Sequence, residues 1–317
     1  MTRVWSIPMS TRFRGITVRE GVLIEGAAGW GEWSPFTEYA PGVAEPWLRC
    51  AEEAAAGDWP APVRDAVPVN ATVPVVPPEV AHALVLRSGC ATAKVKVADP
   101  GSVLADDLAR VEAVRDALGP AGHLRVDANG VWSVDDAVAA IVALDRAAGG
   151  LEYVEQPCAT VEELAAVRRR VDVPIAADES IRRAADPYRV RDLEAADVAV
   201  LKVQPLGGVR ACLRIAEDIG LPVVVSSALE TSVGLAAGVA LAAALPTLDH
   251  ACGLATRALL TGDVASPELV PVNGALPVVV PTVVPSLLDA VAASPERVAW
   301  WEERLAAVRA VRQAPRS

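Results

Sequence analysis

The sequence predicts an α/β protein, built as a parallel barrel with a smaller piece of different texture at its beginning. Short β-branched runs alternate with helical patterns from residue 67 onward, and eight such runs can be counted. Residues 1 to about 65 lack this alternation. Strands that alternate with helices favour a parallel sheet, and eight strands is the number that closes such a sheet into a barrel.

Antiparallel strands are expected in the first 65 residues. Between residues 14 and 32, β-branched residues are interrupted by glycines, a pattern typical of an antiparallel hairpin or meander. Residues 45–57 have the pattern of a helix with a mostly alanine face. The aromatic-rich segment 33–39 lies between them and allows two interpretations, a hydrophobic plug beneath the small sheet or a lid over a pocket.

The barrel strands are expected at residues 67–73, 93–97, 124–127, 151–155, 173–177, 198–203, 223–226 and 248–252. Two of the intervening helices carry clear local signals. Thr160 and Glu163 form a capping-box pattern at the start of one helix. Residues 102–118 have the pattern of a second helix, and Gly119 follows as its stop signal. Its apolar face would be formed by Leu104, Leu108, Val111 and Leu118.

The regular alternation fades after residue 252. Residues 270–276 contain an Asn-Gly pair, which is a strong hairpin signal. Residues 296–312 predict an amphipathic helix whose apolar face is formed by Val298, Trp301, Leu305 and Val308. We expect this tail to pack back on the N-terminal piece.

Composition argues against several classes of protein. The formal net charge is −11, with 29 Lys+Arg against 40 Asp+Glu, so nucleic acid is not expected as a partner. Five widely spaced cysteines without a CxxC pair fit a reducing cytoplasm better than a disulfide framework or a zinc knuckle. The N-terminus lacks the apolar core of a signal peptide, and the long uncharged runs 231–248 and 269–288 are interrupted by polar residues or prolines. We therefore expect a cytoplasmic protein that does not span a membrane.

Acidic residues stand at the ends of three successive predicted strands. They are Asp127, Glu155 and Asp178, each separated from the next by one helix and its connections. The carboxyl ends of barrel strands share one rim, so three carboxylates would repel one another unless a cation lay between them. A hard divalent cation such as Mg²⁺ suits this set. Zinc is disfavoured because none of the three histidines lies beside these strand ends. For Asp127 alone, followed by Asn129, a simple turn is the alternative.

Three lysines lie on strands that flank the acidic set. Lys94 and Lys96 are two residues apart on one strand, so both face the barrel interior, and Lys202 lies on the sixth strand. Lysines are rarely buried without a task, although an exposed strand edge would also accommodate them. A charged neighbour and partial desolvation lower the pKa of a lysine, so Lys94 or Lys96 could act as a base at neutral pH. The expected chemistry is removal of a proton next to a metal-bound carboxylate, with the metal holding the enediolate.

Five segments together resemble the enolase superfamily, muconate-lactonizing-enzyme subgroup: Lys94-x-Lys96, Asp127-x-Asn129, Val154-Glu155-Gln156-Pro157, Asp178-Glu179-Ser180 and Lys202. The resemblance implies a (β/α)7β TIM-like barrel over residues 66–262. It also implies an α+β capping domain formed from residues 1–65 and 263–317. The metal would be Mg²⁺, with Mn²⁺ as a substitute, held by Asp127, Glu155 and Asp178.

Within that subgroup, three loops of this sequence resemble the o-succinylbenzoate synthases of menaquinone biosynthesis. They are residues 31–39, 226–234 and 251–256. The resemblance implies a Mg²⁺-dependent dehydratase acting on a small carboxylate. Lys96 would take the α-proton and then protonate the departing hydroxide in a syn elimination. Lys202 would stabilise the enolate from the other face, including by cation–π contact. Lys94 would lower the pKa of Lys96 by like-charge proximity.

Substrate contacts are expected from Ser226, Ser227 and Asn129. The two serines would bind the succinyl carboxylate through side chains or backbone N–H groups, with a plain strand-end turn as the alternative. One departure from the family pattern is that Val203 and Gln204 separate Lys202 from Pro205.

Two other functions can be set beside the dehydratase. A racemase or epimerase of N-acylated amino acids or dipeptides would use Lys96 and Lys202 as a pair of bases. A binding protein without catalysis is disfavoured because every catalytic position is filled. Nothing in the sequence distinguishes a monomer from a homo-oligomer.

Overall fold

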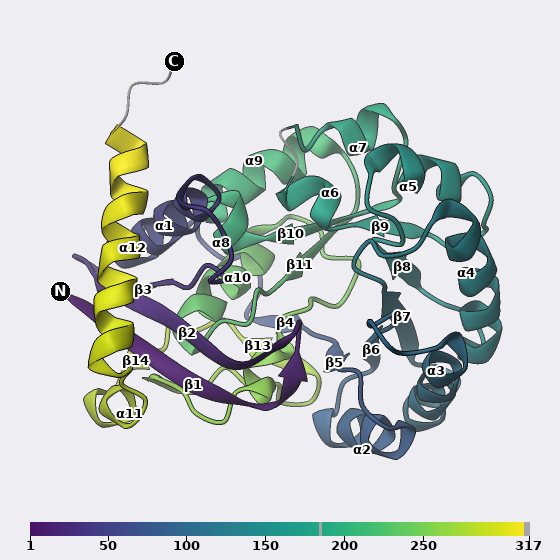
Figure 1. The fold of residues 1–317 in the computed structure, drawn as a ribbon, viewed down its shortest axis with the longest axis horizontal. Coiled ribbons are helices and arrows are strands. Elements are labelled where there is room, and N and C mark those ends of the chain that lie inside the picture. The colour runs from purple at the N-terminus through teal and green to yellow at the C-terminus, as the bar shows by residue number, and fades with distance from the viewer. Residues whose placement is uncertain (184–185, 314–317) are drawn as a thin grey trace.

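The computed structural model describes residues 1–183 and 186–313. The larger part is a curled parallel sheet with helices along its outside, and the smaller part is an antiparallel sheet covered by helices (Figure 1). The first strand and the last helix both lie in the smaller part, so the two ends of the chain build it together (Figure 1). The α/β barrel class predicted from the alternation of strands and helices is confirmed.

The parallel sheet has seven strands in the order β11-β10-β9-β8-β7-β6-β5. In chain order they are β5 (Ala71–Val73), β6 (Thr92–Lys96), β7 (His123–Asp127), β8 (Tyr153–Glu155), β9 (Ile175–Ala177), β10 (Val198–Lys202) and β11 (Val223–Ser226). The intervening helices are α2 (Pro78–Ser88), α3 (Leu104–Leu118), α4 (Val134–Ala148), α5 (Val161–Arg168), α6 (Glu179–Arg182), α7 (Arg189–Asp192), α8 (Val203–Leu206), α9 (Val209–Ile219) and α10 (Ser232–Ala244).

The eighth strand expected at residues 248–252 does not form as a strand. Instead, Cys252 and Gly253 make single bridges to the two edges of the sheet. Cys252 N donates to Pro68 O at 2.8 Å, and Gly253 N donates to Val225 O at 2.8 Å. The segment lacks the β-branched run that favours a strand, so only these bridges join the two edges.

The strand predicted at residues 67–73 is divided into two. Its first half, β4 (Ala66–Pro68), pairs antiparallel with β13 (Ala275–Pro277), and only the second half, β5, joins the parallel sheet. Pro68 has no N–H to donate to a ladder, which favours this break. The Asn-Gly hairpin before β13 is confirmed, with φ of 52° at Asn273 and 75° at Gly274.

Helix ends follow the sequence signals closely. Thr160 caps α5 with the predicted reciprocal bonds to Glu163, and Gly119 ends α3. The predicted apolar face of α3 is wrong at Leu104, which is 39% exposed. Leu104 is the first residue of the helix, while the hydrophobic residues buried further along are Val111 and Val114.

The smaller part confirms the predicted meander but begins earlier. Its strands are β1 (Thr2–Phe13), β2 (Ile16–Glu25) and β3 (Trp30–Trp33), paired antiparallel in that order. The helix predicted at 45–57 is α1 (Pro41–Ala56), which starts at a proline in its first turn and ends before Gly57 in the left-handed conformation. The other short elements are η1 (Ala255–Leu259), β12 (Ala265–Ser266), β14 (Thr282–Val283) and α11 (Pro285–Ala290).

The C-terminal helix α12 (Pro295–Gln313) packs on the smaller part, as predicted. The Trp301 ring meets Trp33 edge-on, with ring centroids 5.4 Å apart. Arg304 of the same helix donates to the carbonyls of Phe36, Thr37 and Tyr39, each at 2.8 Å. The last helix therefore holds the loop that follows β3.

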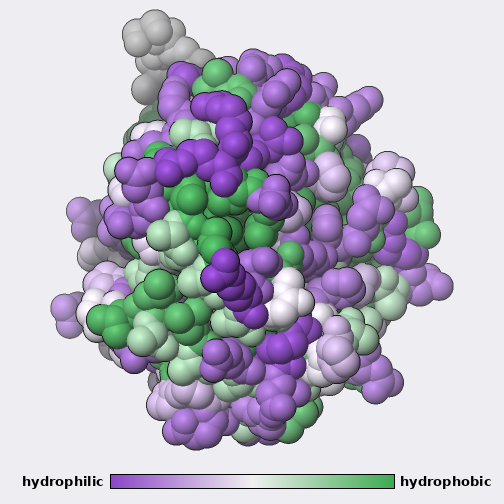
Figure 2. Space-filling model, turned by 90° about the vertical axis from the view of Figure 1, so that its right-hand side faces the viewer, coloured by the Kyte–Doolittle hydropathy of each residue, from purple (hydrophilic) through white to green (hydrophobic). Residues whose placement is uncertain are grey.

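Within the described ranges 1–183 and 186–313, no helix is both long and apolar enough to cross a membrane. The uncharged run at 231–248 forms the buried helix α10 instead. On the side of the molecule shown in Figure 2, hydrophilic residues cover most of the surface and border smaller hydrophobic patches.

Candidate active site

The three predicted carboxylates meet at the carboxyl ends of neighbouring strands. Asp127 ends β7 and pairs in register with Glu155, which ends β8. Asp178 directly follows β9, the next strand of the sheet. All three residues are at most 1% exposed. The sequence prediction that they share one rim is thus met by the backbone register.

Burial and mutual repulsion shape the ionisation of this set. Burial, reinforced by the nearby carboxylate of Asp127, raises the pKa of Glu155 to about 7. Burial also acts to raise the pKa of Asp178, but Arg182 and Lys202 outweigh it and lower that pKa to about 2. Transferring a charged carboxylate from water to the protein interior costs free energy unless cations compensate for it. This rim therefore requires positive charge nearby.

Lysines supply positive charge in the structure. Lys94 Nζ lies 2.6 Å from Glu155 Oε2 and 3.5 Å from Asp127 Oδ2. Although burial acts to lower the pKa of Lys94, the two carboxylates outweigh it and raise that pKa. Lys202 Nζ donates to Asp178 Oδ2 at 2.6 Å from the other side.

Lys96 is the lysine that joins the acidic rim to a neighbouring polar side chain. Its ammonium donates to Asp127 and, at 2.8 Å, to Asn129 Oδ1. Its side chain is 18% exposed, compared with 7% for Lys94. Lys96 is therefore the more accessible of the two lysines on β6.

The carboxylate set fits a hard divalent cation by its donor chemistry. Glu155 Oε1 is buried and has no hydrogen-bond partner, so one oxygen of the set lacks the contact that a metal would provide. Among the residues that the structure describes, no three His, Cys, Asp or Glu side chains are gathered closely enough to hold a metal in their present positions. Lysine ammonium groups contact these carboxylates instead, so metal binding would require the side chains to rearrange.

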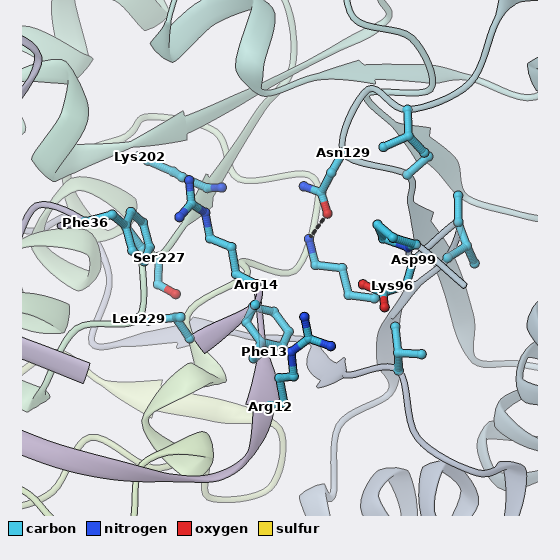
Figure 3. A pocket seen from close by; sticks show the side chains of 18 of the residues that line it. Arg12, Phe13, Arg14, Phe36, Lys96, Asp99, Asn129, Lys202, Ser227 and Leu229 are labelled. Atoms are coloured by element: carbon cyan, nitrogen blue, oxygen red, sulfur yellow. Dashed lines mark hydrogen bonds between the residues drawn. The ribbon is translucent and has the colours of Figure 1, made fainter. Parts of the chain in front are cut away.

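A cavity of about 380 Å³ opens beside this rim. Lys96 and Lys202 point into it from opposite sides (Figure 3). Asn129 and Ser227 also line it, whereas Ser226 is not among its lining residues. A substrate in this cavity would have a lysine on each side.

Each predicted substrate-binding serine already has neighbours. Ser227 Oγ lies 2.5 Å from Thr256 Oγ1, and Ser227 N donates to Gly253 O at 3.0 Å. Ser227 can therefore present its hydroxyl to the cavity, but its backbone N–H is taken. Ser226 pairs with Lys202 across the sheet and is 6% exposed.

Residues from the smaller part line the cavity, and sequence reasoning missed them. Arg12 and Phe13 end β1, and Arg14 begins the turn to β2 (Figure 3). Arg14 lies over Phe36, with its Cζ 3.8 Å from the ring centroid, and donates to Glu38 at 2.6 Å. The signal that could have found this turn is the Arg14-Gly15 step between two β-rich runs.

The aromatic segment 33–39 combines both interpretations offered by the sequence. Trp33, Phe36 and Tyr39 are buried in the hydrophobic core of the smaller part. Phe36 also lines the cavity. The segment therefore fills the core and forms a wall of the pocket at the same time.

Arg182 is another residue that the sequence did not single out. It donates to Asp178 Oδ1 at 2.7 Å and to Glu179 Oε1 at 2.5 Å, and its side chain is 7% exposed. The four-residue spacing from Asp178 to Arg182 at the start of a helix is the local signal for this pair.

Backbone strain gathers at the same rim. Four residues other than glycine have positive φ just beyond barrel strands, namely Ala98 (59°), Asn129 (50°), Gln156 (42°) and Leu229 (66°). Such conformations cost energy and persist where surrounding contacts hold them, often at functional sites. At Gln156 the side chain supplies those contacts, since it accepts from Asp178 N at 3.0 Å and donates to Ser180 Oγ at 2.7 Å.

Two protein families match most of the chain. Residues 4–55 match a family described as Enolase N-terminal domain-like, and residues 78–283 match one described as Enolase C-terminal domain-like. Solved structures agree in fold. A muconate lactonizing enzyme from Pseudomonas fluorescens superposes with a TM-score of 0.77 at 23% identity, covering 95% of this chain and 97% of that one. An N-succinyl Arg/Lys racemase from Bacillus cereus gives 0.78 at 19% identity, covering 92% and 97%. Fold and site thus define an enzyme of the enolase superfamily.

Closer relatives narrow the family. An o-succinylbenzoate synthase from Thermobifida fusca is 67% identical over 308 residues, covering 97% of this chain and 96% of that protein. Another from Mycolicibacterium smegmatis is 59% identical, covering 97% of this chain and 95% of that protein. The chain belongs to the o-succinylbenzoate synthase family, whose members are lyases. The resemblance seen in the sequence motifs is confirmed.

Proposed function

We propose that this chain is a Mg²⁺-dependent dehydratase of menaquinone biosynthesis. It would convert 2-succinyl-6-hydroxy-2,4-cyclohexadiene-1-carboxylate into 2-succinylbenzoate and water. The observation that carries the proposal is the placement of Lys96 and Lys202 on opposite sides of one cavity, beside three buried carboxylates. The identity of 67% with a relative named o-succinylbenzoate synthase supports the choice of substrate.

Asp127, Glu155 and Asp178 would hold the metal. Bound there, Mg²⁺, or Mn²⁺ in its place, would acidify the α-proton of a carboxylate substrate and stabilise the charge that develops on its oxygens. The unpartnered Oε1 of Glu155 supports this assignment. Lys94, which is buried against Glu155 and Asp127, would limit the net negative charge of the site.

Lys96 would act as the base and then as the acid. Its Nζ would take the α-proton of the substrate and return a proton to the hydroxyl oxygen as that group leaves from the same face. The two transfers together remove one water molecule, so atoms and charge balance. Asn129, which accepts a hydrogen bond from Lys96 at 2.8 Å, would keep the ammonium group directed at the cavity.

Lys202 would serve the opposite face of the ring. Its ammonium lies across the cavity from Lys96 and would stabilise the electron-rich enolate, including by cation–π contact. Ser227 would bind the succinyl carboxylate through its hydroxyl at the end of β11, whereas Ser226, predicted for the same role, does not line the cavity. Arg12 and Arg14 would add positive charge at the same mouth of the cavity, because both line it.

A second candidate activity is the racemisation or epimerisation of N-acylated amino acids. The opposed placement of Lys96 and Lys202 favours it, since two bases on opposite faces can remove and return one proton with inversion. The catalytic residues would be the same, so only the substrate separates the two functions.

A paired assay of the purified chain with Mg²⁺ tests the proposal. We expect consumption of the cyclohexadiene substrate, with the aromatic product followed by absorbance. If that substrate is not consumed while an N-succinyl amino acid exchanges its α-proton for deuterium, the dehydratase assignment is overturned in favour of the racemase.

We place the limits of the barrel at residues 66 and 262, with residues 1–65 and 263–317 forming the capping domain. One hydrophobic cluster lies mainly in the barrel and another mainly in the smaller part, which supports this division. We also propose a cytoplasmic location, which five free and buried cysteines support.

A further inference from the structure

Two charged residues of the small sheet are buried where it meets the barrel, and the proposed mechanism does not use them. Arg19 lies on β2 and Glu32 on β3, and each is 2% exposed. Burying a charge costs several kcal/mol, on the order of the whole stability of a domain, unless partners satisfy it. The hydrogen-bond partners of Arg19 and Glu32 therefore indicate their role in the structure.

Arg19 binds the backbone of the loop that connects β11 to α10. Its Nε donates to Leu229 O at 3.1 Å, and its Nη2 donates to Ala228 O at 3.2 Å. The same Nη2 also donates to Ser34 O within the small sheet. The guanidinium group thus ties the barrel loop to the sheet.

Glu32 binds the other end of the same loop. Its Oε2 accepts from Thr231 N at 3.1 Å, from Gly234 N at 3.2 Å and from the Thr231 hydroxyl. These groups form the first turn of α10, where free N–H groups favour a carboxylate. Its other oxygen, Oε1, accepts from Ser34 Oγ at 2.7 Å.

Gly234 makes this approach of Glu32 to the helix sterically feasible. A Cβ at position 234 would lie 2.8 Å from Glu32 Cδ and 2.6 Å from Glu230 Cβ. Both distances are shorter than normal carbon contacts. Only a residue without a side chain allows the carboxylate to lie against this turn.

The loop between these two anchors forms one wall of the cavity. Ser227, Ala228 and Leu229 all line it (Figure 3). Leu229 has a φ of 66°, a left-handed conformation that is strained for leucine. Arg19 bonds to the carbonyl of this residue, which helps to hold it in that conformation.

We infer that Arg19 and Glu32 form a clamp that fixes residues 227–231, one wall of the substrate cavity, to the small sheet β1-β2-β3. The two residues would thus act as positioning residues for substrate binding. The inference rests on the proposed function for the identity of the substrate, but not for the geometry of the clamp. Because neither residue lines the cavity, the clamp acts through the loop.

The clamp predicts a particular kinetic signature. Lys96 and Lys202 lie on β6 and β10, outside the clamped loop, so the proton-transfer groups keep their places when the clamp is lost. Residues 227–231, which would contact the succinyl end of the substrate, lose their anchor and can move. We therefore expect KM to rise about tenfold or more in Arg19→Met, while kcat falls by less than about threefold.

A readout without substrate tests the clamp separately. In the ligand-free protein, amide hydrogen exchange of residues 227–234 should be at least about tenfold faster in Arg19→Met than in the wild type. Gly234→Ala is a second variant, which displaces Glu32 without removing either charge and should show the same two effects. If Arg19→Met fails to fold, Gly234→Ala decides the question.

Arg115→Met is the matched control. Arg115 also binds backbone carbonyls, those of Gly119 at 2.8 Å and Gly122 at 2.7 Å, but it lies at the end of α3 and does not line the cavity. The control should lower thermal stability and leave KM and the exchange of 227–234 unchanged. The clamp is overturned if Arg19→Met and Gly234→Ala lose stability as the control does, with KM and loop exchange equal to those of the wild type. If the wild type does not act on the cyclohexadiene at all, the proposed function fails, and the exchange experiment still decides whether the clamp exists.

Discussion

Lys94 and Glu155 form an ion pair at 2.6 Å inside the barrel, with side chains 7% and 0% exposed. The same ammonium lies 3.5 Å from Asp127, so a single buried cation serves two carboxylates of the rim. This arrangement sets the charge of the site before any metal or substrate arrives.

Lys94→Met should destabilise the metal-free protein strongly. Removing one partner of a buried pair leaves an uncompensated charge, which costs about 3–5 kcal/mol. Mg²⁺ should restore part of this loss, because a bound metal would supply the missing positive charge. Thermal unfolding of the variant with and without Mg²⁺ measures both effects. A variant as stable as the wild type, with no greater response to Mg²⁺, would contradict the role given to Lys94.

Lys96→Ala should lower kcat by about 10²–10⁴-fold, the range expected for loss of a positioned acid or base. Lys202→Ala should also lower kcat, because the enolate would lose the cation opposite Lys96. The measurement is the steady-state rate of the dehydration, with circular dichroism to confirm folding. Retention of full activity by Lys96→Ala would remove this residue from the proton transfers.

Chelation should abolish activity. The proposed metal ligands are all carboxylates, so exhaustive treatment with EDTA is expected to leave an inactive protein that Mg²⁺ or Mn²⁺ reactivates. Zn²⁺ should reactivate it less well, because the site offers no histidine or cysteine ligand. Activity that survives complete removal of divalent metals would exclude a metal-dependent mechanism.

The stability contributed by Glu32 should depend on pH. Burial raises the pKa of Glu32 to about 7, against the opposing hydrogen bonds from Thr231 and Ser34. The charged groups that face it are Arg19 and Glu230. In the unfolded chain a glutamate titrates near about 4.3, so between that value and about 7 the folded state binds the extra proton.

The contribution of Glu32 to stability is thus fully present below the unfolded pKa and is lost as the pH rises through about 7. Relative to Glu32→Gln, the wild type should lose up to about 3 kcal/mol of unfolding free energy between pH 5 and pH 8. Urea unfolding of both proteins at the two pH values measures this difference. A difference that stays constant or grows with pH would contradict the prediction. A proton on Oε1 leaves Oε2 free to accept the loop amides, so the clamp can persist in both states.

The sequence was most informative for site residues whose positions depend only on the order of the strands. Asp127 and Glu155 each end a short apolar run, and Asp178 follows one, so counting strands was enough to bring them to one rim. The two-residue period of a strand likewise placed Lys94 and Lys96 on the same inner face. These inferences depend only on local pattern and on the parallel arrangement, both of which a single sequence contains.

Features that depend on long-range contact were not predictable in the same way. Arg14 reaches the cavity because a hairpin turn meets the barrel mouth, and no local pattern records that meeting. The expected eighth strand is reduced to bridges at Cys252 and Gly253, because their neighbours lack strand-forming residues. Arg19 and Glu32 look like ordinary alternating polar residues of a sheet, and only the docked barrel shows that they are buried.

The contact of Arg304 with the loop after β3 joins one wall of the cavity to a helix far along the chain. This arginine holds the carbonyls of Phe36 and Tyr39, and Phe36 lines the pocket. Arg304 lies in a helix of 19 residues at the end of the chain. The hydrogen bond to Phe36 joins residues that are 268 positions apart in the sequence. Contacts between residues so far apart in sequence carry a loop-closure cost, so we expect this wall to become ordered after the barrel strands have paired.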